Sequence, residues 1–257
     1  MLNSKLSIHN AVGKIDLPLS RYLMTGMVIL GVAFLGGFLL VRAATVDSLS
    51  LEGVFASQVR DTAAEERAVM LGAEDRAIRH AAIQELSVLG SETATDRLIE
   101  FFGKDEYLAT DGLPTAQALG RMGTPQAINA LVEGLGEGQP PARQYVAMTG
   151  LEEAGESAVE PLIAALGSED AVLRRNAAEM LGWIASPRAF DPLLSALSDA
   201  SPEVRKQAAW ALGEVDALRA IPHLSKLQAE EEDAAVREWV AEALTYLYRK
   251  VAQSTDL

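Results

Sequence analysis

The sequence predicts an all-α protein, in which one membrane-spanning helix precedes an α-solenoid of five to six helical hairpins. Three observations support this prediction: a long uncharged stretch near the N-terminus, a repeat of 31 to 33 residues after it, and a composition rich in Ala and Leu. Aromatic residues make up only 5% of the chain, and β-branched residues are few in its last two thirds. This composition favours close-packed helices over strands.

The sequence divides the 257-residue chain into five segments. They are a basic N-terminal segment (1–21), a transmembrane helix (22–41), a linker and capping helix (42–73), the repeat solenoid (74–250) and a C-terminal tail (251–257).

Charge is distributed unevenly along the chain. Residues 1–46 hold four basic residues and one acidic residue, a net charge of +3, so the remaining 211 residues carry −17 of the total of −14. Basic side chains supply most of the nonspecific affinity for nucleic acids, and so we expect no nucleic-acid partner. The absence of cysteine excludes disulfides, thiolate metal sites and a Cys nucleophile, and it leaves the compartment open.

The predicted anchor is the run from Tyr22 to Val41, which contains no charged residue. Twenty helical residues span roughly 30 Å, the thickness of the hydrocarbon core of a bilayer. Arg21 and Arg42 bracket the run at positions where their charges reach the two interfaces. A cleaved signal peptide is the alternative, with Val41-Arg42-Ala43 as its cleavage site. The run is longer than a typical signal-peptide core, which favours a retained signal-anchor.

Flanking charge predicts the orientation of this anchor. Residues 1–21 have a net charge of +2, and residues 42–60 have a net charge of zero. The positive-inside rule therefore places the N-terminus in the cytoplasm and the repeats on the periplasmic or extracytoplasmic side. Within the helix, Gly26, Ala33 and Gly37 share one stripe on which a second membrane helix can approach closely. The alternative is the ordinary glycine content of a membrane helix.

The repeat is clearest where residues 181–194 align without gaps to residues 119–132. An apolar residue followed by Arg opens most units, and a core position follows seven residues later. These core positions are Leu86, Leu119, Gly150, Leu181, Leu212 and Leu244. Each unit reads as two short helices joined by a turn such as Ser186-Pro187. A lone hairpin cannot bury its apolar face, and so the units are expected to stack.

These motifs resemble HEAT repeats of the phycobilisome-lyase-like subclass, whose pattern is V-R-x-x-A-A-x-A-L-G, a turn, A-V-x-x-L and an acidic turn. The resemblance covers about residues 74–250, as five full units and a final half. It implies the fold strongly and function weakly, since such repeats occur in lyases, hydroxylases and scaffolds.

Two units depart from this pattern. The second begins without the Arg, after an insert at residues 104–110, and its Pro114 is expected to trim or kink the first helix. The third has Gly150 at the core position, where we expect a gap in the packing.

The recurring arginines are expected to lie near turns between the units. The arginines are Arg79, Arg143, Arg174, Arg205 and Arg237, and the turns that they should lie near contain Asp75, Asp170, Glu203 or Asp233. An Arg–carboxylate ladder between units explains why the spacing equals the repeat. An anion-binding ladder is the alternative.

No pattern of catalytic or metal-binding residues stands out. None of His9, His80 and His223 has a metal-ligand spacing. HEAT-like hydroxylases hold iron with His-Glu pairs, but His80 and His223 are followed by Ala and Leu. We therefore predict a protein that is not an enzyme and has no metal or cofactor.

Four aromatic residues mark the predicted protein-binding face. Tyr145, Trp183, Trp210 and Trp239 all lie 160° to 220° around the first helix from the core position of their unit. Exposed Trp and Tyr are typical of interface hot spots. Folding of the rings against neighbouring units is the alternative, and the inner face formed by the second helices is the other candidate surface.

The expected function is a membrane-anchored protein-binding scaffold, as an accessory or stabilising subunit of a larger membrane complex. The alternative is an assembly factor or lyase-like chaperone for a cofactor-bearing protein. Bilin lyases are typically soluble, which makes the anchor an argument against the alternative.

Overall fold

The computed structural model describes residues 6–10, 13–17 and 48–255, in two units that meet at residues 56 and 57. The predicted transmembrane helix and its Gly26, Ala33 and Gly37 lie outside the described residues. None of the helices in the described ranges is both long and apolar enough to cross a membrane.

The first unit contains a hairpin that the sequence analysis did not predict. Strands β1 (Leu6–Asn10) and β2 (Gly13–Leu17) pair antiparallel, with Ile8 opposite Ile15. Apolar residues alternate with polar ones in both strands, which is the period-two signal of a strand. Helix α3 (Ser48–Ala68) begins in this unit.

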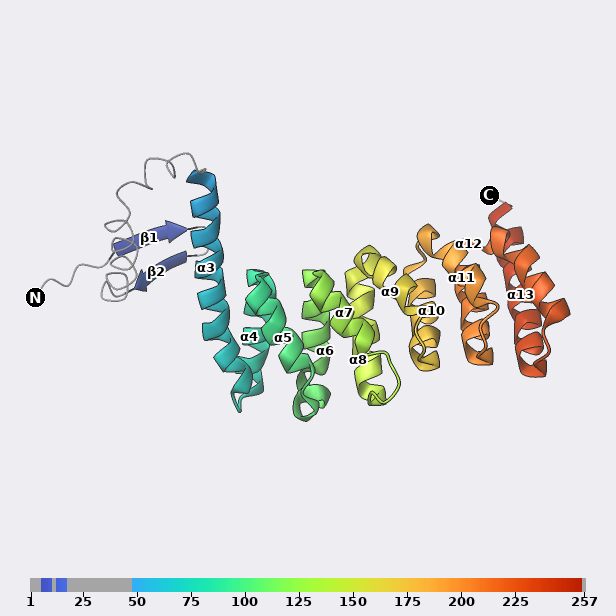
Figure 1. The fold of residues 1–257 in the computed structure, drawn as a ribbon, viewed down its shortest axis with the longest axis horizontal. Coiled ribbons are helices and arrows are strands. Elements are labelled where there is room, and N and C mark those ends of the chain that lie inside the picture. Colours follow the sequence, from blue (N-terminus) through green and yellow to red (C-terminus); the bar gives the residue numbers. More distant parts are fainter. Residues whose placement is uncertain (1–5, 11–12, 18–47, 256–257) are drawn as a thin grey trace, which may run out of the picture. The chain divides into compact units, whose positions relative to one another are not determined.

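The second unit is an all-α solenoid of five helical hairpins and a final helix, which confirms the predicted fold for this part of the chain. Its helices follow one another in chain order along the stack (Figure 1). The hairpins are α4 (Arg76–Leu89) with α5 (Glu92–Phe102), α6 (Asp105–Met122) with α7 (Pro125–Glu133), α8 (Pro141–Ala154) with α9 (Val159–Ala165), α10 (Ala171–Ile184) with α11 (Phe190–Ala196), and the two halves of α12 (Pro202–Glu230). Helix α13 (Ala234–Thr255) ends the stack. Short 3-10 turns lie at Val69–Gly72, Gly155–Ala158 and Pro187–Ala189.

The helices form two layers. The first helices contact one another in the order α4, α6, α8, α10, α12 and α13, and among the second helices α5 contacts α7 and α7 contacts α9. The second half of α3 is tied to the first hairpin by ion pairs of Arg67 with Glu85 and of Glu65 with Arg97. This is the place where the sequence analysis expects a capping helix.

Caps fix where the helices begin and end. Side chains of Ser91 and Thr124 accept hydrogen bonds from the backbone amides of their own helices at 3.2 Å, as N-caps do. Asp216 interrupts α12 with an extended backbone (φ −158°, ψ 93°), and its carboxylate accepts a bond from the backbone N–H of Arg219. The single helical element therefore works as the two arms of the fifth hairpin.

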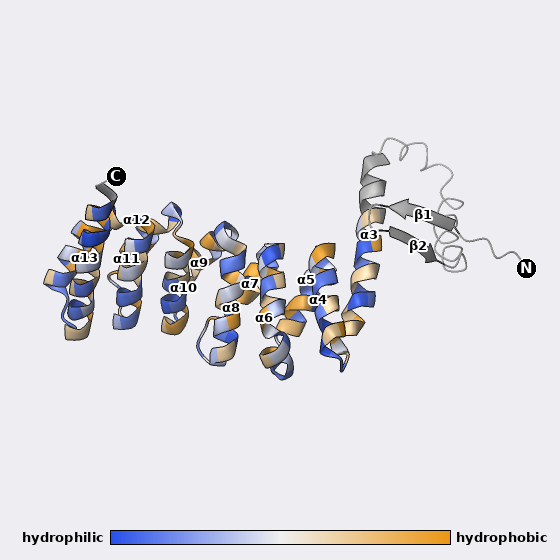
Figure 2. Ribbon diagram, turned by 180° about the vertical axis from the view of Figure 1, so that it is seen from behind, coloured by the Kyte–Doolittle hydropathy of each residue, from blue (hydrophilic) through white to orange (hydrophobic). Residues whose placement is uncertain are grey.

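One continuous core runs through the repeats. All six predicted core positions are buried, from Leu86 in α4 to Leu244 in α13. Hydrophobic residues recur in every helix of the stack, with hydrophilic residues between them (Figure 2). Each hairpin therefore buries its apolar face against its neighbours, as expected of stacked repeats.

The expected gap at Gly150 is wrong, because the two helix backbones meet there. A Cβ atom added at Gly150 would lie 2.6 Å from the carbonyl oxygen of Ala116, and one at Gly120 would lie 2.1 Å from the carbonyl oxygen of Gly150. The missing side chains let α6 and α8 approach to backbone contact. At this core position the two helices therefore pack through backbone contact instead of through a side chain.

The expected trimming of the helix at Pro114 is also wrong. Helix α6 runs through Pro114, and the insert supplies its first turns from Asp105 onward. Proline has no N–H to donate to the carbonyl four residues earlier, which is that of Thr110. Arg76 Nη2 donates to this oxygen at 2.9 Å instead. A side chain of the preceding unit thereby replaces the lost helical hydrogen bond.

Candidate protein-binding surface

The four predicted aromatic residues differ in exposure. Tyr145 on α8 and Trp183 on α10 are 66% and 64% exposed, as expected of an outward-facing position. Trp210 on α12 and Trp239 on α13 are half-buried and pack against the core. The expected outward orientation is therefore wrong for these two residues, whose rings fold against neighbouring helices.

A glycine explains where the ring of Trp210 lies. A Cβ atom at Gly182 would stand 2.5 Å from the Trp210 ring and 2.9 Å from Cα of Ala211. The ring therefore covers bare backbone of α10. It also meets Trp183, with ring centroids 5.3 Å apart and planes tilted by 59°. This tilted arrangement is a favourable one for aromatic pairs.

A groove of 360 Å³ opens between α12 and α13. Trp210 and Trp239 both line it, so that the three tryptophans of successive first helices come together on one surface. The remaining lining residues are Ala209, Gly213, Glu214, Glu242, Ala243, Tyr246 and Leu247. We call this cavity the α12–α13 groove. The small residues among its lining leave the space open.

Tyr246 is not among the residues predicted from the sequence, yet it is 53% exposed and lines the groove. Tyr246 lies two residues after the core residue Leu244, the same offset that separates Trp183 from Leu181. That shared offset was the signal that would have identified it. Tyr145 lies apart, because none of the ring contacts among the described residues joins it to a tryptophan.

Both charge signs meet at the rim of the groove. Lys250 Nζ lies 3.0 Å from Glu214 Oε2, 3.5 Å from the carbonyl oxygen of Gly213 and 5.9 Å from the centroid of the Tyr246 ring. Glu242 is exposed, and the described residues offer it neither an ion pair nor a hydrogen bond. Lys250 therefore neutralises the carboxylate of Glu214, whereas the carboxylate of Glu242 is available to pair with another cation.

A ladder of arginines joins the units at another surface. Arg174 Nη1 donates to the carbonyl oxygens of Ser168 and Glu169, both at 2.9 Å, while Nε and Nη2 hold the two carboxylate oxygens of Asp199 at 2.7 and 2.8 Å. The same pair of carbonyl contacts, six and five residues before the arginine, recurs at Arg79, Arg205 and Arg237. The predicted Arg–carboxylate ladder is confirmed for Arg79, Arg143, Arg174 and Arg205, whereas the bonds shown for Arg237 go to the two carbonyl oxygens alone.

The arginines lie at the turns where they are expected, but their ion-pair partners are other carboxylates. Arg79 binds Asp111, Arg174 binds Asp199, Arg205 binds Glu231, and Arg143 binds Asp105 of the preceding unit. The aspartates expected there are N-caps instead: Asp75, Asp170 and Asp233 accept bonds from the amides of Ala77, Val172 and Ala235. Glu203 pairs with Lys206 in its own helix. Asp111 lies in the following hairpin, whereas Asp199 and Glu231 lie in the turns that follow the hairpin of their own arginine.

The ladder perturbs the acidity of its carboxylates. Hydrogen bonds from Arg174 hold the pKa of Asp199 below its usual value, and hydrogen bonds from Arg205 do the same to the pKa of Glu231. Desolvation opposes both shifts. These carboxylates are therefore charged partners that stabilise the junctions between units.

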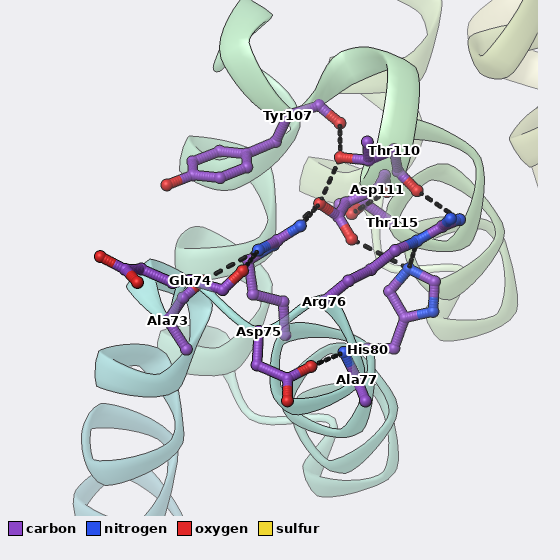
Figure 3. Close-up of polar contacts among 11 residues, drawn as sticks. Ala73, Glu74, Asp75, Arg76, Ala77, His80, Tyr107, Thr110, Asp111 and Thr115 are labelled. Atoms are coloured by element: carbon purple, nitrogen blue, oxygen red, sulfur yellow. Dashed lines mark hydrogen bonds and ion pairs between the residues drawn. The ribbon is translucent and has the colours of Figure 1, made fainter.

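The junction between α4 and α6 buries a polar cluster around Asp111 (Figure 3). Asp111 is fully buried, and its Oδ2 receives Arg79 Nη2 at 2.8 Å and the hydroxyl of Thr110 at 2.7 Å. Oδ1 faces His80 Nε2 at 2.9 Å. Arg76 Nε–H donates to this nitrogen at 3.2 Å, so that Nε2 is an acceptor. Asp111 Oδ1 therefore receives no hydrogen bond from the described residues, and the ion pair of Arg79 with Oδ2 joins the two units.

Neither His80 nor His223 belongs to a metal-binding cluster. In the part of the chain that the structure describes, no three His, Cys, Asp or Glu side chains are grouped to hold a metal ion. His80 faces Asp111, and His223 stands edge-on to Phe190 with ring centroids 6.3 Å apart.

Comparison with protein families identifies the repeats. A model for HEAT repeats matches residues 159–245, and a model for the PBS lyase HEAT-like repeat matches residues 115–137. The resemblance to HEAT repeats expected from the sequence is confirmed over these residues. A search of curated proteins finds no match.

Several solved structures are similar to this chain. Human deoxyhypusine hydroxylase in complex with glycerol is 19% identical at a TM-score of 0.39, over 76% of this chain and 98% of that one. The complex of CpcE and CpcF of phycocyanin lyase from Nostoc sp. PCC7120 is 21% identical at a TM-score of 0.37, over 69% and 74%. A designed armadillo repeat protein in complex with the peptide (KR)4 is 18% identical at a TM-score of 0.38, over 71% and 98%.

Proposed function

We propose that this chain, which contains HEAT repeats, is a membrane-anchored scaffold whose repeats bind a protein partner through the first helices of the last units. The observation that carries the proposal is the meeting of Trp183, Trp210 and Trp239 beside the α12–α13 groove. Aromatic side chains around a hollow are typical of interface hot spots, and helical-repeat solenoids commonly bind proteins. Tyr145 extends the proposed face toward α8.

The proposed anchor is the uncharged helix at residues 22–41, with the N-terminus in the cytoplasm and the repeats on the extracytoplasmic side. Its length and the basic excess before it support this topology. A tether would hold the acidic repeats beside other membrane proteins. We therefore assign the chain the role of an accessory or stabilising subunit of a larger membrane complex.

We propose binding without catalysis. The polar groups that the structure brings together are engaged in joining the units, as in the pairs of Arg174 with Asp199 and Arg205 with Glu231. The charged groups at the aromatic surface are the glutamates and the lysine of the groove rim, and the lysine is paired with Glu214.

The second candidate is an assembly factor or lyase-like chaperone for a cofactor-bearing protein. The match of residues 115–137 to the PBS lyase HEAT-like repeat favours it. The two roles differ in their complexes. A stabilising subunit stays bound at fixed stoichiometry, whereas an assembly factor binds transiently and its partner carries a chromophore.

Purification of the full-length chain from membranes in a mild detergent, through a C-terminal tag, tests the proposal. We expect one or a few membrane proteins to co-purify at constant ratio through size exclusion, without visible absorbance. Co-purification of a coloured protein in less than equal amount favours the second candidate. Elution of the chain alone, at native abundance and in several detergents, contradicts the scaffold role.

A further inference from the structure

We propose that the α12–α13 groove binds an arginine or lysine side chain of the partner protein. The inference rests on the proposed function, because it names the chemistry of the partner at the same surface. It also makes a claim that is separate from that function, since a partner can bind the repeats without inserting a cation into this groove.

The lining of the groove matches a cationic side chain. The rings of Trp210, Trp239 and Tyr246 supply aromatic surface for the aliphatic stem and for cation–π contact with the charged head. Glu214 and Glu242 stand at the same groove and carry the opposite charge. No basic residue is among the groove's lining residues. The combination of ring faces and carboxylates selects a cation over a neutral or acidic group.

The chain itself places a cation at the edge of this site. Lys250 reaches three lining residues at once: the carboxylate of Glu214, the carbonyl oxygen of Gly213 and the ring of Tyr246. Its ammonium group makes the kind of contacts that a partner's cation would make further inside. Lys250 therefore shows which contacts a cation makes at the edge of the groove. It also competes with the partner's cation for these groups.

The charge of Glu242 has no partner among the described residues. An exposed glutamate is usually satisfied by water, but this one lines the same groove as Trp239 and Trp210. A cation between the rings would pair with it directly. The net charge of −17 on residues 47–257 adds a long-range attraction for basic partners.

A pair of tripeptides tests the chemistry directly. The probes are acetyl-Ala-Arg-Ala-amide and the same peptide with citrulline, which keeps the shape of arginine and removes its charge. Each is titrated into the full-length protein in detergent, in the Trp183→Phe background, so that the tryptophan fluorescence comes from the groove. We expect a saturable change with the arginine peptide and about fivefold weaker binding of the citrulline peptide.

Substitutions in the groove sharpen the test. Ala243→Leu fills the groove and should abolish the change, whereas Ala235→Leu, on an exposed face of the same helix, should leave it intact. Glu242→Gln should weaken arginine binding by about threefold. Lys250→Gln removes the competitor and should strengthen it by about twofold or more. A gain of affinity cannot come from damage to the fold.

The outcomes separate the two proposals. Equal binding of both peptides, no saturable change, or an unchanged signal in Ala243→Leu overturns the cation site, even where a partner co-purifies with the chain. Selective arginine binding that depends on Ala243 and Glu242 supports the cation site, even where the co-purification experiment fails.

Discussion

At the residue scale, the junctions between units depend on arginines that bond to two partners at once. Arg205 donates to two carbonyl oxygens of the turn before its own helix and to both oxygens of Glu231, the C-cap residue of α12 in the turn before the last helix. The side chain of Glu231 is only 4% exposed, so its charge needs this partner. Removal of either side chain of such a pair would leave the charge of the other side chain unpaired at the junction between units.

Replacement of Arg205 by Gln should therefore be strongly destabilising. The change leaves a buried carboxylate and two carbonyl oxygens without a guanidinium, and we expect a loss of about 3 kcal/mol in the free energy of unfolding. Arg188→Gln is the matched control, because Arg188 pairs with exposed glutamates and should cost less than about 1 kcal/mol. Chemical denaturation of the full-length chain measures both. Equal losses in the two variants would show that the ladder position has no special role.

The same pairs predict how stability depends on pH. Because the folded-state pKa values of Asp199 and Glu231 are lowered, their contribution to stability is complete above the unfolded-state values near pH 4 and is lost as the pH falls through the folded-state values. We expect the free energy of unfolding to fall between about pH 5 and pH 2. Glu231→Gln should be less stable at pH 7 and should lose less on acidification. A slope identical to that of the unchanged protein would contradict the assignment.

Sequence reasoning located the arginines of this ladder and not their acidic partners. The repeat spacing fixes the position of each arginine in its helix, and it says nothing of which carboxylate its long side chain reaches. Asp170 and Asp199 both lie in acidic turns, yet one caps a helix and the other receives an arginine. Which carboxylate an arginine reaches depends on the geometry of two neighbouring turns, and the repeat pattern does not encode this geometry.

At the scale of the helix, small residues decide how closely the units stack. Gly120 and Gly150 bring the backbones of α6 and α8 together, and Gly182 admits the ring of Trp210. The repeat pattern predicts Leu at position 150, because the other units have Leu at this core position. The helical spacing was right, but whether a glycine leaves a void or admits a backbone depends on the opposite helix.

The close contact at Gly150 leads to a stability prediction. Gly150→Ala places a methyl group 2.6 Å from a backbone oxygen, so the helices must separate, and we expect a loss of about 2 kcal/mol or more despite the better helix propensity of Ala. Gly72→Ala is the control, since nothing lies within 4 Å of its added Cβ. Thermal melts followed by circular dichroism compare the two variants. A stabilised Gly150→Ala protein would mean that the helices are not in backbone contact.

At the scale of the whole molecule, some elements predicted from the sequence lie within the described residues and one, the membrane anchor, lies outside them. The solenoid and its number of hairpins followed from the repeat alone, because each unit obeys the same packing rule. The paired strands β1 and β2 were not predicted from the sequence, because two short alternating runs are a weak signal beside a long apolar segment. The proposed anchor at residues 22–41 depends on length and charge alone.

The absence of cysteine makes the proposed topology directly measurable. Single cysteines introduced as Ser4→Cys and Ala235→Cys report the two sides of the membrane to a maleimide that does not cross it. We expect Ala235→Cys to be labelled in intact cells and Ser4→Cys only after lysis, with the chain retained in the membrane after a carbonate wash. The reverse labelling pattern would place the repeats in the cytoplasm, and release by carbonate would remove the anchor.

The central claim is that the aromatic surface of the first helices binds the partner. The most direct measurement compares the partner recovered, per mole of tagged chain, with the unchanged protein and with a variant in which the two exposed members, Trp183 and Tyr145, become Gln. Trp210 and Trp239 are left unchanged because their rings pack against the core. We expect circular dichroism and the melting temperature to change little and recovery to fall by about tenfold or more. Full recovery of the same partner by a folded variant would contradict the claim.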